Sequence, residues 1–168
     1  MGYRNILIPL DGSDLAELAL GEVQNIADPQ SHVHLLSIVN ETPLNEMEAF
    51  GMAASQTMMA ANAQISATLP AVAAPEKVSA EVLNREHYLR VAAEKLCEKG
   101  FEVSTEVQSG HVIDTIHTIM AKGYDMVIMS THGRTGLSKL VLGSVAEGVL
   151  HGACCPVLLV KATAAQNR

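Results

Sequence analysis

Aromatic residues and positive charge are both scarce in this chain. Aromatic side chains make up 3% of the 168 residues, and tryptophan is absent. Proteins that bind single-stranded nucleic acid stack the bases on aromatic side chains, so that class is not expected. The 18 acidic residues outnumber the 11 lysines and arginines, which gives a formal net charge of −7. Because a surface that binds a nucleic-acid duplex is normally basic, no nucleic-acid partner is predicted.

Cysteines and long apolar runs are also few. The three cysteines are an odd number, and their spacing is not that of a disulfide framework. No apolar run approaches the roughly 20 residues that a membrane-spanning helix needs. No signal-peptide pattern precedes the first predicted strand, which begins after Asn5. We therefore expect a cytoplasmic protein that is not inserted in a membrane.

Signatures of catalysis and of metal binding are missing too. The pattern G-x-x-x-x-G-K-[ST], whose lysine holds the terminal phosphates in many nucleotide hydrolases, does not occur. His132 has no carboxylate or nucleophile beside it in sequence, so a loop histidine bonded to backbone is the favoured interpretation. His151 lies near Cys154 and Cys155, but the four-ligand spacing of a zinc site is absent. No catalytic residue and no metal ligand are predicted.

Strand patterns and helix patterns alternate along the chain. Strands are predicted at residues 6–10, 33–39, 101–107, 125–129 and 156–160, and helices at 16–26, 79–99, 111–122 and 144–151. Such alternation with short linkers predicts an α/β fold: one parallel five-stranded sheet with helices on both faces. Right-handed crossovers leave few topologies, and we expect the strand order 3-2-1-4-5.

One domain is predicted over residues 1–168, with two irregular parts. Residues 41–80 hold four methionines among many Ala, Ser and Thr residues, interrupted by prolines, and are interpreted as a variable insertion. A surface excursion is favoured over a lid or a Met-rich contact surface. The residues from about 162 onward are expected to form a flexible tail.

Two loops are expected to meet at one edge of the sheet. Ligands of open α/β sheets bind outside the carboxyl ends of the strands, where the strand order reverses. With the order 3-2-1-4-5, the loop at Asp11 and the loop from Ser130 to Gly136 both lie there. The second loop contains glycines and leads to Gly143-Ser144, which opens a helix. A strand, a glycine loop and a helix start present free N–H groups to a phosphate, so a nucleotide site is predicted.

At these residues the sequence resembles the universal stress protein family. The similar segments are Asn5-Ile6-Leu7-Ile8-Pro9-Leu10-Asp11-Gly12-Ser13, Thr131-His132-Gly133-Arg134-Thr135-Gly136-Leu137, Leu142-Gly143-Ser144-Val145 and Cys155-Pro156-Val157-Leu158-Leu159-Val160. They span almost the whole chain except the insertion. The resemblance implies an adenine nucleotide alpha hydrolase-like fold and a role in the stress response.

Members of this family that bind ATP carry Gly, two residues, Gly, nine residues, then Gly followed by Ser or Thr. The second and third glycines match Gly133 and Gly143, and Ser144 follows. Ser130 stands at the position of the first glycine, which departs from the pattern. The resemblance thus implies ATP, or a related adenine nucleotide, as cofactor, alone or with Mg²⁺.

Site residues are carried over from the family by position. The resemblance places Asp11 at the adenosine end, and it places the Ile38 backbone at the adenine edge. The Ser144 hydroxyl is expected to bond a phosphate oxygen or to help hold Mg²⁺. The complete predicted site comprises Pro9, Leu10, Asp11, Ile38, Met129, Ser130, Thr131, His132, Gly133, Arg134, Thr135, Gly136, Gly143, Ser144, Val145 and Ala146.

Three functions remain open from the sequence. The first is a nucleotide-binding regulator that passes its state to an unidentified protein partner. The second is an ATP hydrolase, expected to be slow because no P-loop lysine and no obvious base are present. The third is a dimeric interaction module without a nucleotide, which Ser130 keeps open. The apolar run at 157–160 is expected at a sheet edge, and the family resemblance implies a homodimer through this strand.

Overall fold

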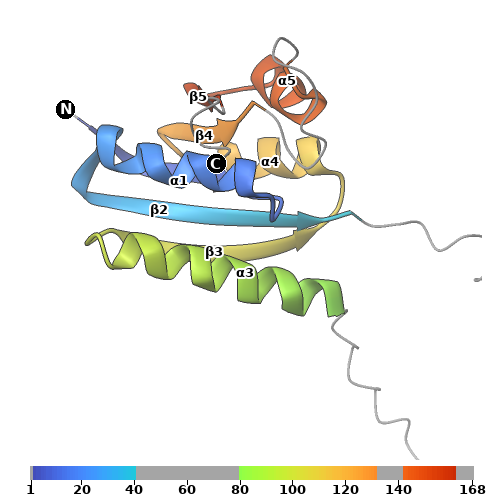
Figure 1. Cartoon of the computed structure of the whole chain (residues 1–168). Coiled ribbons are helices and arrows are strands. Elements are labelled where there is room, and N and C mark those ends of the chain that lie inside the picture. Colours follow the sequence, from blue (N-terminus) through green and yellow to red (C-terminus); the bar gives the residue numbers. More distant parts are fainter. Residues whose placement is uncertain (1, 41–79, 132–141, 162–168) are drawn as a thin grey trace, which may run out of the picture. The chain divides into compact units, whose positions relative to one another are not determined.

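The computed structural model describes residues 2–40, 80–131 and 142–161, and these form one α/β unit. Strands and helices alternate along the chain, as predicted (Figure 1). The elements are β1 (Tyr3–Pro9), α1 (Asp14–Ile26), β2 (Ala27–Val39), α3 (Ala80–Cys97), β3 (Glu102–Ser109), α4 (Val112–Met120), β4 (Met126–Ser130), α5 (Ser144–His151) and β5 (Val157–Val160).

The five strands form a single parallel sheet in the order β3-β2-β1-β4-β5, which confirms the predicted topology. β1 lies at the centre, between β2 and β4. Ile6 pairs with Met126 and Leu7 with Val127, so β1 and β4 run side by side toward the same edge of the sheet. The reversal of strand order therefore falls between these two strands, where a ligand is expected.

Apolar side chains of the strands alternate between two cores, one on each face of the sheet. Ile6, Ile8 and Leu35 point to the face that α1 and α3 cover, whereas Leu7 and Leu36 point to the face that α4 and α5 cover. All five of these side chains are fully buried. Because both faces are covered, the central strands carry continuous apolar runs, and this is why they were visible in the sequence.

The largest difference from the predicted boundaries is at the start of β2. The predicted helix ended at residue 26 and the predicted strand began at residue 33, but β2 begins at Ala27. Tyr3 pairs with Ala27 and Asn5 with His32, so the ladder between β1 and β2 is irregular here. Asp28 also accepts a hydrogen bond from the Gly2 backbone N–H at 3.1 Å. These contacts between distant segments extend a strand whose first residues have little strand propensity.

The predicted insertion at residues 41–80 and the predicted tail from residue 162 lie almost entirely outside the described residues, which resume at Ala80 and end at Lys161. Among the helices that are described, none combines the length and the apolar composition required to cross a bilayer.

Candidate functional site

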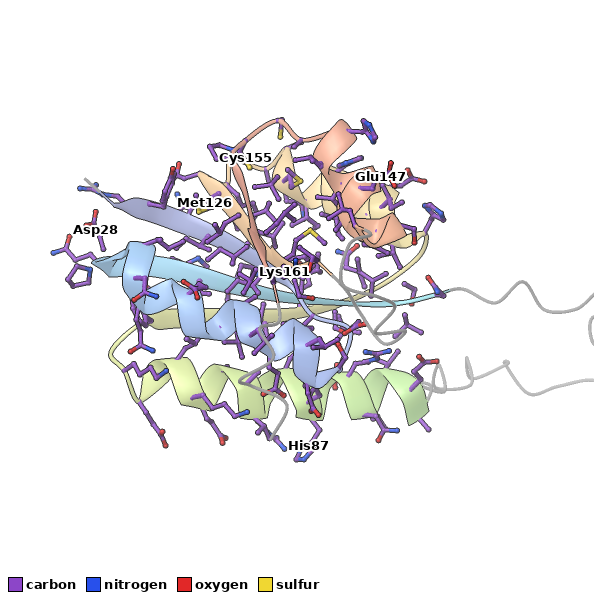
Figure 2. The ribbon with its side chains drawn as sticks, turned by 45° about the horizontal axis from the view of Figure 1, so that its top comes forward. Asp28, His87, Met126, Glu147, Cys155 and Lys161 are labelled. Atoms are coloured by element: carbon purple, nitrogen blue, oxygen red, sulfur yellow. The ribbon has the colours of Figure 1, made fainter. Side chains whose placement is uncertain are left out.

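The candidate site lies at the carboxyl edge of the sheet, where β1 and β4 end beside each other. Continuing their register three residues beyond Leu7 and Val127 places Leu10 next to Ser130. Figure 2 shows this edge on the side of Glu147, in the first turn of α5, whereas Asp28 marks the opposite edge. The structure thus brings the β1 end, the β4 end and the α5 start together, as the sequence predicted for this edge.

The turn after β1 is held by the side chains of its own residues. One carboxylate oxygen of Asp11, Oδ1, accepts hydrogen bonds from the Ser13 backbone N–H at 3.0 Å and from the Ser13 hydroxyl at 2.6 Å. The Ser13 hydroxyl in turn caps α1 by accepting from the Ala16 N–H at 3.1 Å. Asp11 therefore has the structural role of fixing the turn, and any contact with a ligand is made by a carboxylate whose position is already set.

Leu10 can offer only its side chain to the site, because its backbone N–H and carbonyl are already bonded within the protein. Its N–H donates to the Leu36 carbonyl at 2.8 Å, and its carbonyl accepts from the buried Ser37 hydroxyl at 2.9 Å. Ile38 is half-buried in the core under α4 and α5 and pairs with Gln108 of β3. Pro9 is half-buried as well and has no N–H to offer.

The end of β4 is tied to β5 and to α5 through one residue. The Thr131 N–H donates to the Val160 carbonyl at 2.9 Å, and the Thr131 carbonyl accepts from the Gly143 N–H at 2.8 Å. Gly143 is one of the predicted site residues, but its N–H is not available to a phosphate because the Thr131 carbonyl accepts from it. Gly143 instead serves as the N-cap that anchors α5 to the strand end. Met129 is buried in the core that α4 and α5 cover.

The first turn of α5 contains backbone donors for which the described residues supply no acceptor. Gly143 has φ −65° and ψ 148°, and it provides no side-chain cap. The first backbone bond of the helix runs from the Glu147 N–H to the Gly143 carbonyl at 2.9 Å. Within the described ranges, the N–H groups of Ser144, Val145 and Ala146 have no acceptor. Three amides at a helix start, with the positive end of the helix dipole, are suited to an anion.

The rest of the predicted phosphate loop falls in the range 132–141, outside the described residues. This applies to five of the predicted site residues: His132, Gly133, Arg134, Thr135 and Gly136.

Close packing between α4 and α5 fixes where the α5 start lies. A Cβ on Gly148 would collide with the Cδ1 of Ile113, and a Cβ on Gly152 would stand 2.6 Å from Nε2 of His117. The same Nε2 donates to the Val149 carbonyl at 3.2 Å. Two glycines four residues apart therefore let α4 approach α5 at the level of its backbone, and a larger side chain at either position would displace the helix.

Sequence reasoning missed one residue at this edge, Arg85 of α3. It is 9% exposed, and its Nη1 donates to the backbone carbonyl of Asp11. Nearby on the same helix, the Tyr88 hydroxyl is buried without a hydrogen-bond partner among the described residues. Burial, and then the negative charge of Glu17, Asp11 and Asp14, raises the pKa of Tyr88, so that the hydroxyl stays protonated. Only the helical pattern around Arg85, which places it on the same side as Leu89, could have suggested that it points inward.

A second polar cluster joins β2 to β3, the two strands on the side of β1 opposite β4. His34 Nε2 is 3.0 Å from Oε2 of Glu106, and His34 Nδ1 is 2.7 Å from the Ser104 hydroxyl. Burial lowers the pKa of His34 although the Glu106 carboxylate opposes this. A hydrogen bond from Gln108 is the main reason why the pKa of Glu106 is lowered. In the part of the chain that the structure describes, no cluster of three or more His, Cys, Asp or Glu side chains could hold a metal ion.

The chain is similar to known proteins in sequence and in structure. The profile of the Universal stress protein family matches residues 2–161. Universal stress protein MJ0531 of Methanocaldococcus jannaschii is 31% identical over 163 residues, which cover 95% of this chain and 82% of that protein.

Solved structures agree with the fold. The structure of protein MJ0577 superimposes with a TM-score of 0.70 at 26% identity, covering 97% of this chain and 99% of that one. A universal stress protein family protein from Arabidopsis thaliana, solved with AMP bound, gives a TM-score of 0.62 at 15% identity, covering 98% and 95%. These neighbours have the adenine nucleotide alpha hydrolase-like fold, which this chain shares.

Proposed function

Because this chain belongs to the universal stress protein family, we propose that it binds ATP, or a related adenine nucleotide, between the ends of β1 and β4. We further propose that it acts in the cytoplasm as a stress-response regulator rather than as an enzyme. The observation that carries the proposal is the first turn of α5, where three amides have no acceptor within the described residues. They lie at the topological switch point of the sheet, beside the end of β4.

The adenosine and the phosphates of the nucleotide are assigned to different parts of the site. Asp11, with Pro9 and Leu10 beside it, meets the adenosine end, since a carboxylate can accept hydrogen bonds from a ribose hydroxyl or the adenine amine. The Ile38 backbone reads the adenine edge. Met129, Ser130 and Thr131 form the floor under the ribose, and the loop residues His132, Gly133, Arg134, Thr135 and Gly136 enclose the phosphates.

The phosphates reach the start of α5. Gly143 anchors the helix, and the N–H groups of Ser144, Val145 and Ala146 donate to phosphate oxygens. The Ser144 side chain is exposed, so its hydroxyl is available to a phosphate oxygen or to an accompanying Mg²⁺. The relative from Arabidopsis thaliana, solved with AMP, supports an adenine nucleotide as the class of ligand.

The test is to identify what the purified protein carries. Mass spectrometry of small molecules released by denaturation is expected to find ATP, ADP or AMP in an amount that approaches the protein concentration. Titration calorimetry of the emptied protein with ATP and Mg²⁺ checks the same claim. Absence of a bound nucleotide, together with no heat of binding, would favour the interaction module that Ser130 keeps open. Ser130→Gly then decides whether this position limits the affinity.

Hydrolysis is a separate question and has a separate test. The chain has no P-loop lysine, so single-turnover hydrolysis of bound ATP should be far slower than the roughly 1 to 1,000 per second of typical enzymes. A rate within that range would favour the hydrolase.

We also propose that two copies of the chain pair along β5 in a symmetric homodimer. β5 is the last strand of the sheet, and its four residues are half-exposed. Pro156 and Val160 accept bonds from β4, so in a parallel ladder the N–H of Leu159 points to the open edge. Leu159→Pro removes that donor and should give monomers on size-exclusion chromatography, whereas Leu159→Ala keeps it and should remain dimeric. Identical elution of both variants with the wild type would refute this interface.

A further inference from the structure

Arg85 is a buried cation that reaches from α3 to the loop of the proposed adenosine site. Its Nη1 donates to the carbonyl oxygen of Asp11, 74 residues earlier in the chain. In Figure 2, His87 lies on the outward side of α3, while Arg85 is 9% exposed and faces the interior. The contact therefore joins α3 to the turn that follows β1, the central strand of the sheet.

Within the described residues, few groups bond directly to the Arg85 guanidinium. Among the described residues, its other partner is Glu81, whose Oε1 lies 3.7 Å from Nη2 and whose side chain is 56% exposed. Burying a guanidinium is costly, and a single carbonyl with a long, exposed ion pair gives limited compensation. Packing alone thus gives little reason for an arginine here, whereas the direction of the Asp11 carbonyl depends on it.

The loop is shaped to receive this side chain. Gly12 has φ +83°, and a Cβ added to it would stand 3.1 Å from Nη1 of Arg85. A residue with a side chain would be strained in this conformation. With Gly12 in place, the peptide between Asp11 and Gly12 turns its carbonyl toward α3, while the Asp11 carboxylate is bonded to Ser13. Asp11 is therefore fixed through both its main chain and its side chain.

The charges on the facing helix explain why a cation belongs at this place. The turn after β1 and the first turn of α1 carry Asp11, Asp14 and Glu17. α3 supplies two cations opposite them, namely Arg85 at Asp11 and Lys95, whose Nζ lies 2.6 Å from Oε2 of Glu17. Lys95 holds the two helices together at a distance from the loop, which makes it the matched control for Arg85.

We propose that Arg85 is a positioning residue for nucleotide binding. It orients the peptide after Asp11, and with it the carboxylate that the proposed function assigns to the adenosine end. Arg85 touches the loop and not the ligand, so its effect should not depend on the number of phosphates. The inference rests on the proposed function and adds to it a determinant of affinity that lies on α3, outside the strand-end loops.

Calorimetry with AMP and with ATP, both in Mg²⁺, tests this inference on the full chain. Arg85→Met should lower the affinity for AMP and for ATP by the same factor, about tenfold, because both ligands share the adenosine end. Arg85→Lys should recover most of the loss, since one ammonium hydrogen bond to the carbonyl suffices. Lys95→Met should stay within about twofold of the wild type, although it also removes a cation between α3 and α1.

The outcomes separate this inference from the proposed function. Wild-type protein that binds neither nucleotide would overturn both. Wild-type binding with an unchanged Arg85→Met affinity, or with an equal loss in Lys95→Met, would overturn only the role of Arg85. A loss that grows from AMP to ATP would make Arg85 a phosphate contact and would also overturn it. If Arg85→Met does not fold, Arg85→Gln, which is too short to reach the carbonyl, is measured against Arg85→Lys with the same expectation.

Discussion

The two halves of the candidate site are built in opposite ways. In the β1 half, the Asp11 carbonyl, the Asp11 carboxylate and both Leu10 backbone groups all have protein partners. In the half formed by β4 and α5, the anchors Thr131 and Gly143 are bonded to the protein, but the next three amides of α5 have no acceptor within the described residues. One half is fixed by bonds within the protein, whereas the other offers, among the described residues, three donors to the proposed ligand.

The difference matches the chemistry of the two ends of a nucleotide. The adenosine end is recognised by shape and by a few directed hydrogen bonds, which require rigid partners. The phosphate end carries most of the charge, and backbone donors at a helix start serve it without a side chain. Variants in one half should therefore change the stability and the nucleotide affinity differently from variants in the other half.

The largest effect is expected at Gly152, where α5 packs closely against α4. Gly152→Ala would place a methyl group against the ring of His117 and disturb the bond from that ring to the Val149 carbonyl. We expect the free energy of unfolding to fall by about 2 kcal/mol, as for overpacked interiors, and the affinity for ATP to fall with the displaced helix. Chemical denaturation and calorimetry measure the two effects.

The control for Gly152 is Gly21 in the interior of α1, where nothing lies within 4 Å of an added Cβ. Gly21→Ala should raise the stability by about 0.5 to 1 kcal/mol, because alanine favours a helix. If the two substitutions changed the stability alike, the close contact between α4 and α5 would not position the site.

A smaller effect is expected from removing a single donor at the α5 start. Ser144 is the first helical residue, and Gly143 before it has the extended conformation that a following proline requires. Ser144→Pro should thus keep the helix, delete the N–H and the hydroxyl, and weaken ATP binding by about tenfold. Ser144→Ala deletes the hydroxyl alone and should weaken binding by about threefold at most. Equal affinities of the two variants would show that the backbone donor has no part in binding.

The smallest effect concerns His34 and Glu106, which link β2 to β3 and are part of neither half. Burial lowers the pKa of His34 from its ordinary 6.5, so protonation favours the unfolded chain. The stability conferred by neutral His34 is therefore present above pH 6.5 and is lost as the pH falls through the lowered pKa. The lowered pKa of Glu106 adds a further loss below its ordinary 4.5.

Thermal unfolding between pH 7.5 and 5 checks this expectation. The melting temperature of the wild type should fall with acidification, and His34→Gln should flatten the profile. His87→Gln, at an exposed position on α3, should leave the profile unchanged. A wild-type profile that stays flat over this range would contradict the role given to His34 in the pH dependence of stability.

The elements that were predicted well are those whose signal is local. Continuous apolar runs reveal the central strand at 6–10, buried on both faces, and the half-exposed edge strand at 156–160. Gly100 marks the end of α3 with φ +91°. The pair Gly143-Ser144 identified the start of α5 to the residue. Strand order followed from general rules of topology, because β-α-β alternation leaves few arrangements.

What escaped prediction depends on contacts between distant segments. Nothing near Arg85 in sequence reveals that it reaches Asp11, and nothing near Gly143 reveals that its N–H is taken by Thr131. The pairing of His34 with Glu106 likewise needs the register of β2 and β3. Side-chain partners across the sheet are fixed by packing, which a single sequence shows only as periodicity.

The central claim is that an adenine nucleotide binds between the ends of β1 and β4, with its phosphates on α5. Titration of the ¹⁵N-labelled protein with ATP and Mg²⁺, followed by amide NMR shifts, tests it most directly. Saturable shifts are predicted at Asp11, Gly12, Ser144, Val145 and Ala146, with Tyr3 and Asp28, near the starts of β1 and β2, unaffected. Shifts confined to other parts of the chain, or none at saturating ATP, would contradict the claim.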